Sequence, residues 1–266
     1  MMRHILRLSY DGGSFSGWQV QPEAASVQGE IEKALETLLR QPIGITGCGR
    51  TDTGVNACSY VAHFDAPSEV VEDAERLCCK LNAILPFGIC IHEIIPASED
   101  FHARFDAVSR SYRYFIHFNK DPFIGEMSWH CKYRLDVDRM NEAARELLGT
   151  RDFSCFEKSG GSNMTSICTI TRAVWERWTP SHVRELGFPA AEGDYIVFTI
   201  TADRFLRNMV RAIVGSLVDV GRGKRDTEWF RELISGGTRS DAGQSVPGRA
   251  LFLKEIVYPD GAKRKI

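Results

Sequence analysis

The stretch SRSYRYFIHF, residues 109–118, decides the fold. Successive side chains of a β-strand point to opposite faces. One face of this stretch would carry Tyr112, Tyr114, Ile116 and Phe118, and the other Ser111, Arg113, Phe115 and His117. The alternation predicts a strand near the middle of the chain, and helices and strands can be traced outward from it on both sides.

Hydrophobic periodicity and turn residues predict the remaining elements. Toward the N-terminus they indicate strands over 3–10, 43–48, 60–64 and 88–95, with helices over 26–40 and 69–82. Ser26 is the expected N-cap of the first helix, and Pro42 ends it. Toward the C-terminus they indicate helices over 136–148, 205–220 and 227–234, with strands over 166–178, 194–202 and 250–258.

This element order predicts an α+β fold built from two split β-α-β halves that merge into one antiparallel sheet. The strands over 166–178 and 194–202 are expected to form a meander or hairpin. The expected N-terminal half covers residues 1–107, and the C-terminal half covers 108–266. No repeat is visible in the letters, so the duplication is inferred from element order alone.

The composition is that of a soluble globular protein, with 43% hydrophobic and 26% charged residues among 266. No apolar run has the length of a membrane span, and the N-terminal MMRHILRLSYDGG lacks the apolar core of a signal peptide. A cytoplasmic protein is expected. Its eight cysteines include no C-x-x-C pair, which argues against zinc and favours reduced, mostly buried thiols.

The net charge of −2 argues against a nucleic-acid partner, but a sum can hide a local basic surface. Basic residues outnumber acidic ones in two segments, 102–114 and 203–225. Acidic residues concentrate elsewhere, in 30–36, 69–75 and 136–146. Such a distribution is compatible with binding one structured polyanion.

The segment GCGRTDTGVNA, residues 47–57, has three glycines in its first eight positions, which indicates an unusual backbone path. Arg50 and Asp52 are two residues apart, so in an extended segment they share a face. A guanidinium orients a carboxylate, and an oriented carboxylate can act as nucleophile or general base. The alternative is a turn with a surface salt bridge.

Two further segments combine arginines with apolar or aromatic residues. In FHARFDAVSRSYRY, residues 101–114, the pattern suits RNA because cations hold phosphates and rings stack on splayed bases. In FLRNMVRAIVGSLVDVG, which starts at Phe205, a helix would place Arg204, Arg207 and Arg211 on one face beside an apolar stripe. A half-buried strand and a solvated helix face are the respective alternatives.

Taken together, these segments resemble the tRNA pseudouridine synthase A family. The matching stretches are YDGGSFSGWQVQ at 10–21, GRTDTGVNA at 49–57, FHARFDAVSRSYRY at 101–114, FLRNMVRAIVGSL at 205–217, and a closing strand from Val246. They keep the family's order over nearly the whole chain. The resemblance implies two ferredoxin-like halves with a basic cleft between them, and a homodimer that binds the anticodon stem-loop of tRNA.

The resemblance also implies the activity and its residues. The reaction is conversion of uridine to pseudouridine at tRNA positions 38–40, by an isomerase that needs no cofactor and no metal. Asp52 is the implied nucleophile, Tyr112 stacks on the target base, and Arg211 pairs with Asp52. Arg50 matches the arginine that assists base flipping. The basic residues Arg104, Arg110 and Arg207 are further candidates for binding substrate.

Two departures from the family pattern are visible: Thr53 and Asn56 replace Ala and His, and Gly248–Leu251 follows Pro247 where Gly-Leu is common. Two other functions compete with the enzyme. A non-catalytic RNA-binding or chaperone protein on the same fold predicts a damaged GRTD segment, whereas Arg50, Asp52, Tyr112 and Arg211 are all present. A small-molecule hydrolase with Asp52 as base predicts activity without RNA.

Overall fold

The computed structural model describes residues 1–67, 71, 73–160 and 164–259. The chain forms two units: unit 1 comprises Met1–Arg110 and the C-terminal strand from Leu253, and unit 2 comprises Ser111–Phe252. The predicted boundary, with halves 1–107 and 108–266, stays a prediction.

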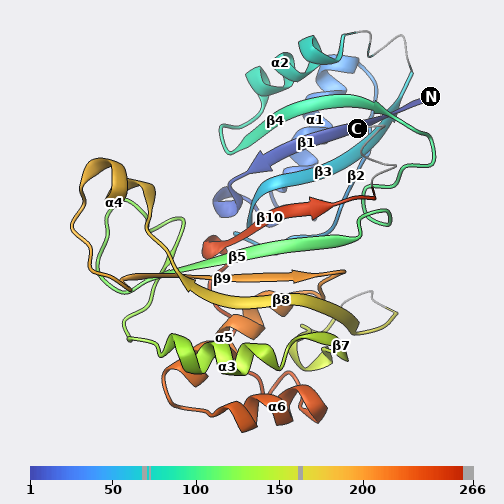
Figure 1. Ribbon diagram of the computed structural model, residues 1–266. Helices are drawn as coiled ribbons and strands as arrows, with labels where there is room; N and C mark the ends of the chain where they lie inside the picture. Colours follow the sequence, from blue (N-terminus) through green and yellow to red (C-terminus); the bar gives the residue numbers. More distant parts are fainter. Residues whose placement is uncertain (68–70, 72, 161–163, 260–266) are drawn as a thin grey trace. The chain divides into compact units, whose positions relative to one another are not determined.

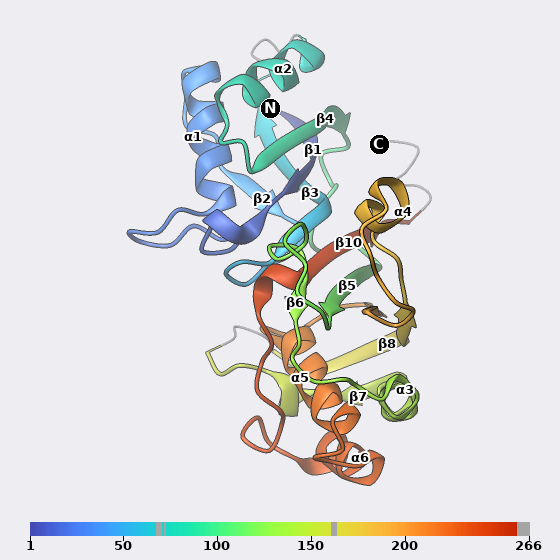
Figure 2. The same ribbon diagram turned by 90° about the vertical axis from the view of Figure 1, so that its left-hand side faces the viewer.

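Unit 1 follows the element order of a split β-α-β unit (Figures 1 and 2). Its elements are β1 (Met2–Tyr10), α1 (Val27–Leu39), β2 (Ile45–Gly47), β3 (Asn56–Ala66), α2 (Ala74–Ile84) and β4 (Ile89–Ala97), with β10 (Leu251–Val257) added at the end of the chain. Strand β1 pairs antiparallel with both β3 and β4, and β2 pairs with β3. The strand order β4-β1-β3-β2 is that of a ferredoxin-like unit.

The first helix begins and ends as its sequence predicts. The Ser26 hydroxyl accepts the Gly29 N–H at 3.2 Å, which is the expected N-cap. The helix buries Val27, Ile31 and Leu35, whose spacing puts them on one face. For α2, the expected start near residue 69 falls among residues 68–70 and 72, which lie outside the described residues; the helix has its N-cap at Asp73.

Unit 2 has the strand order β5-β9-β8-β7. Its strands are β5 (Ser109–His117), β6 (Trp129–His130), β7 (Gly149–Asp152), β8 (Ile167–Arg177) and β9 (Tyr195–Ala202), and its helices are α3 (Val137–Arg145), α4 (Ser181–Leu186), α5 (Met209–Gly221) and α6 (Thr227–Gly236). Strands β8 and β9 pair antiparallel, which confirms the predicted hairpin. The two-residue β6 pairs parallel with β5.

The predicted fold class is confirmed: the chain is mixed α+β with a largely antiparallel sheet. Three short elements were not expected, namely β6, β7 and α4. Among residues 1–67, 71, 73–160 and 164–259, no helix combines the length and apolar character needed to cross a membrane.

The expectation of mostly buried thiols is only half right. All eight cysteines are free; Cys48, Cys131, Cys155 and Cys168 are buried, Cys58, Cys79 and Cys90 are exposed, and Cys78 lies between.

Candidate active site

In unit 1, the loop between β2 and β3 carries Arg50 and Asp52. The Cys48 N–H donates to the Val61 carbonyl at 2.9 Å, which continues the β2–β3 pairing into the loop. The Val55 N–H donates to the Asp52 carbonyl at 3.1 Å and closes a turn around the aspartate. Asp52 is half-buried, and its backbone is therefore held in a defined turn at the surface of unit 1.

The first motif of the sequence, residues 10–19, packs directly against this loop. The Trp18 N–H donates to the Thr51 carbonyl at 3.3 Å, and the Gly12 N–H donates to the Asn56 side chain at 2.8 Å. Gly17 has a φ of +91°, and a Cβ there would lie 2.3 Å from the Thr51 oxygen. The backbone of one motif thus shapes the backbone of the other on either side of Asp52.

Aromatic side chains form the floor beneath the loop. The Trp18 and Tyr60 rings stack with centroids 4.1 Å apart, and Tyr10 packs edge-on to Tyr60 at 5.5 Å. The Tyr60 hydroxyl donates to the Gly49 carbonyl, and the Tyr10 hydroxyl lies 2.9 Å from the Thr51 hydroxyl. Trp18 is buried in the core of unit 1. This floor therefore supports Gly49 and Thr51, the residues on either side of Arg50.

Arg50 points outward from the same loop. Its side chain is exposed, and its Nε donates to the Gln19 side chain at 3.2 Å. Gln19 belongs to the 10–19 loop, so this bond also links the two motifs. The guanidinium remains accessible to a polyanion that approaches the surface of unit 1.

Arg110 joins a second segment to this loop. Its guanidinium donates to three backbone carbonyls: Ala107 at 2.8 Å, Arg104 at 2.6 Å and Cys48 at 3.2 Å. The last two bonds come from the same nitrogen, Nη2, so the Arg104 and Cys48 carbonyl oxygens are neighbours. Arg110 therefore braces the loop that leads to Asp52, a structural role that its place in a basic segment did not indicate. The Arg104 side chain is exposed.

In unit 2, Tyr112 lies on β5 with its side chain half-buried. Its ring meets Phe205 edge-on, with centroids 5.1 Å apart and planes at 88°. Phe205 belongs to the basic segment that precedes α5. The contact fixes the orientation of the Tyr112 ring against Phe205.

The basic segment of unit 2 differs from its predicted form. Helix α5 begins at Met209 rather than near Phe205, because Asn208 adopts a left-handed conformation with φ +64°. The Lys158 N–H donates to the Arg207 carbonyl at 3.1 Å, which draws the preceding residues into a loop. The prediction that Arg204, Arg207 and Arg211 share one helix face is wrong, since only Arg211 lies in the helix.

Arg211 is bound to a segment near the end of the chain. Its Nε donates to the Val246 carbonyl at 2.7 Å, and the Val246 N–H donates to the Arg211 carbonyl at 3.2 Å. The Tyr114 hydroxyl donates to the neighbouring Pro247 carbonyl at 3.1 Å. Burial raises the pKa of Tyr114, so this hydroxyl stays protonated as a donor.

Segment 244–247 also lies against the middle of α5. A Cβ on Gly215 would be 1.9 Å from the Gln244 carbonyl oxygen, so only glycine allows this approach. Tyr114, Val246 and Gly215 were missed as supports of the site. The match of the closing strand to the family was the one signal in the sequence that pointed to this segment.

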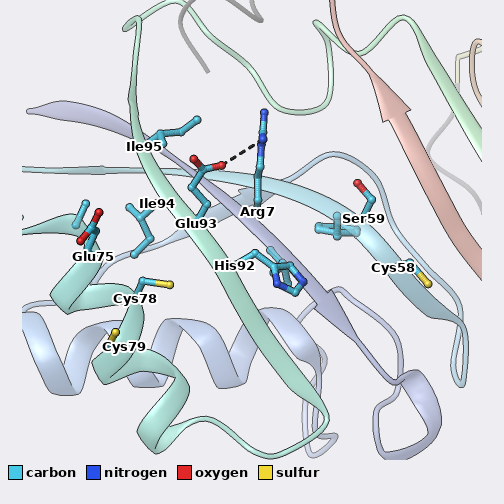
Figure 3. A pocket seen from close by; sticks show the side chains of 13 residues that line it. Arg7, Cys58, Ser59, Glu75, Cys78, Cys79, His92, Glu93, Ile94 and Ile95 are labelled. Carbon is cyan, nitrogen blue, oxygen red and sulfur yellow. Dashed lines mark ion pairs between the residues drawn. The ribbon is translucent and has the colours of Figure 1, made fainter.

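A pocket lies elsewhere on unit 1 (Figure 3). It has a volume of about 720 Å³ and is lined by residues of β1, β3, α2 and β4. The lining side chains include His92, Arg7 and Glu93. Arg7 and Glu93 form an ion pair, with Nη1 and Oε2 3.2 Å apart. None of the predicted site residues lines it. Over the described residues, no group of three or more His, Cys, Asp or Glu side chains could hold a metal ion.

Comparison with known proteins gives matches over nearly the whole chain. A family model described as tRNA pseudouridine synthase matches residues 143–259. The tRNA pseudouridine synthase A of Porphyromonas gingivalis is 46% identical, over 97% of this chain and 98% of that protein. The proteins of the same name from Parabacteroides distasonis and Bacillus subtilis are 45% and 38% identical, over 98% and 97% of this chain and 97% and 99% of theirs.

Among solved structures, an H/ACA ribonucleoprotein bound to a substrate RNA contains a chain with weak similarity. The TM-score is 0.36 at 9% sequence identity, over 82% of this chain and 44% of that chain. A likeness of this size supports no argument about function.

Proposed function

This chain belongs to the tRNA pseudouridine synthase A family, and from that membership we propose how its residues work. It is an isomerase that converts uridine to pseudouridine in tRNA. In this reaction the bond between uracil N1 and the sugar C1′ breaks, and a bond between C5 and C1′ forms. The proton on C5 is lost and N1 gains one, so the atoms balance without an oxidant, a reductant or net consumption of water.

Asp52 is the proposed nucleophile. Its support is the construction of its loop, in which backbone hydrogen bonds from the 10–19 motif hold Thr51 on one side and Asn56 on the other. A fixed backbone limits the positions that the Asp52 carboxylate can take, so less conformational freedom is lost when it attacks. Attack on the sugar C1′ and attack on the base both remain compatible with this role.

Tyr112 and Arg211 are the proposed partners of Asp52, and both come from unit 2. Tyr112 would stack on the extruded uracil and assist proton transfer, and Arg211 would pair with the carboxylate. The support for Arg211 is its fixed position on α5, where its Nε donates to the Val246 carbonyl. Arg50 would assist flipping, which costs a few kcal/mol, and Arg104, Arg110 and Arg207 would contribute positive charge toward phosphates.

The proposed target is a uridine in the anticodon stem-loop, at tRNA positions 38–40, and the proposed assembly is a homodimer. Both rest on membership in the family. A cytoplasmic location is proposed because eight free cysteines suit a reducing compartment. Light scattering of the purified protein tests the dimer, for which twice the chain mass of 29.9 kDa is expected.

The decisive experiment compares the wild-type protein with Asp52→Ala on unmodified tRNA. We expect pseudouridine with the wild type, none with Asp52→Ala, and similar tRNA affinity for both, because the substitution removes the attacking carboxylate and no cation. Pseudouridine is mapped chemically and binding is measured by filter retention. Thr53→Ala, which alters an exposed neighbour, is the matched control and should remain active. Pseudouridine formation by Asp52→Ala would refute the assignment of the nucleophile.

A further inference from the structure

Phe105 is a large apolar side chain that unit 1 holds in solvent. It is 74% exposed, although burial of a phenylalanine ring away from water is energetically favourable. Single exposed apolar residues are common and do not by themselves indicate a binding site. The surroundings of Phe105 distinguish it, because its loop is ordered by its own side chains and carries both an aromatic ring and a cation next to it.

Hydrogen bonds from successive backbone N–H groups hold this loop in place. The His102 N–H donates to the Asp106 carboxylate at 2.8 Å, and the Arg104 and Phe105 N–H groups donate to His102 Nδ1 at 3.2 and 3.3 Å. The Ala103 N–H donates to Nδ1 of the buried His63 at 3.2 Å. The exposed position of Phe105 is therefore built into the loop and does not result from a frayed segment.

Side chains flank the Phe105 ring. The His102 ring lies against it with centroids 4.3 Å apart and planes tilted by 36°. The Arg104 guanidinium lies 5.6 Å from the centre of the ring and is itself exposed. An exposed ring with a cation beside it is the combination that binds unpaired bases, since the ring stacks on the base and the cation attracts the phosphate.

This arrangement is connected to the loop of Asp52. Through Nη2 of Arg110, the Arg104 carbonyl is a neighbour of the Cys48 carbonyl, and Cys48 is four residues from Asp52. Four residues span about 14 Å at most, and the step between the two carbonyl oxygens, 2.6 and 3.2 Å from the same nitrogen, adds at most about 6 Å. Nucleotides adjacent to an extruded uridine would fall within such a range.

We propose that Phe105 stacks on an unpaired base of the bound tRNA, with Arg104 at the neighbouring phosphate. The proposal deepens the proposed function and rests on it. Phe105 acts here as a binding residue that positions the RNA, and it takes no part in bond making or breaking. Its ring has no hydrogen-bonding groups, so the contact tolerates any of the four bases.

The test is a substitution series at Phe105, with tRNA affinity measured at several salt concentrations. Phe105→Ala should weaken binding about tenfold or more, the scale of one lost base stack, while Phe105→Trp and Phe105→Tyr keep most of the affinity. The dependence of log Kd on log salt should not change, because no phosphate contact is removed. Arg104→Ala should reduce that slope by about 0.7–0.9.

Phe87→Ala is the matched control, because Phe87 is a fully exposed phenylalanine of the same unit. It should bind tRNA as the wild type does. Equal affinities for wild type and Phe105→Ala, or an equal loss of affinity in Phe105→Ala and Phe87→Ala, would overturn the proposal. The proposed function would still stand if the wild-type protein is active. If the wild-type protein itself neither binds nor modifies tRNA, the proposed function fails first. Thermal melting of each variant shows whether it is folded.

Discussion

At the scale of single residues, Arg211 combines one observed contact with one proposed task. Its Nε holds Val246, while the rest of the guanidinium is proposed to serve Asp52. Arg211→Ala should lower the single-turnover rate about 100-fold, the scale of removing one preorganised donor from an active site. Affinity for tRNA should change little, because the other basic side chains proposed to meet phosphates remain. Rapid-quench kinetics at saturating enzyme measures the rate.

Arg211→Ala also removes the bond to Val246, and Tyr114→Phe is the control for that effect. Tyr114→Phe removes only a hydrogen bond to Pro247 in the same segment. That variant should lose about 1 kcal/mol of unfolding free energy and retain most of its rate. Near-wild-type turnover by Arg211→Ala would contradict a catalytic role for this side chain, and an equal loss of rate in Tyr114→Phe would reassign it to support of the segment.

At the scale of elements, the two motifs around Asp52 behave as one structure, and Gly17 is one point where they approach closely. Gly17→Ala would place a Cβ 2.3 Å from the Thr51 oxygen at a φ of +91°. We expect a loss of about 2 kcal/mol or more in the free energy of unfolding, because strain and overlap act together. The rate should also fall, since displacement of Thr51 moves Asp52. Urea unfolding and single-turnover kinetics measure the two effects.

Gly49→Ala is the internal control for that prediction. A Cβ at Gly49 would meet nothing within 4 Å, so its effect on stability should stay within about 0.5 kcal/mol. If the two variants lose stability equally, the close approach of the motifs does not explain the requirement for glycine.

The elements also show which kinds of interaction a sequence reveals. Alternation in β5 and the hydrophobic spacing of α1 are local patterns, so both elements were predictable along with the Ser26 cap. The start of α5 was not, because the left-handed Asn208 and the bond from Lys158 to Arg207 depend on a segment 49 residues away. An apolar stripe cannot show where a tertiary contact interrupts a helix.

The same limit applies to the candidate site. Resemblance supplied Asp52, Tyr112 and Arg211, and composition supplied the basic segments. Neither could separate Arg110, whose guanidinium is used on three backbone carbonyls, from the exposed Arg104 six residues before it. Hydrogen bonds between residues distant in sequence leave no periodic trace, so roles that depend on them emerge only with the fold.

At the scale of the whole molecule, both units bury histidines in their neutral form. His4 and His63 in unit 1 and His117 in unit 2 are buried, and loss of hydration is the main cause that lowers the pKa of each. For His63 the pKa falls to about 4. Its Nδ1 accepts the Ala103 N–H, so protonation of that nitrogen would remove the bond that anchors the loop of Phe105.

The direction of the pH effect follows from the difference between the pKa of a buried histidine in the folded chain and its pKa in the unfolded chain. An unfolded histidine has a pKa of about 6.5, so between pH 6.5 and 4 the unfolded chain binds protons that the folded chain does not. The free energy of unfolding should therefore be largest above pH 6.5 and fall as the pH decreases. His63 should account for roughly 3 kcal/mol of this loss when the pH reaches 4. Urea unfolding at a series of pH values measures the decline.

His63→Gln isolates the contribution of that one residue. Glutamine can still accept the Ala103 N–H but does not titrate, and the titration of carboxylates is common to both proteins, so it cancels in the difference between them. The variant should lose less stability than the wild type between pH 6.5 and 4. Parallel pH profiles for the two proteins would show that His63 takes up its proton in the folded state as readily as in the unfolded chain, and acid sensitivity would then have to arise from other groups.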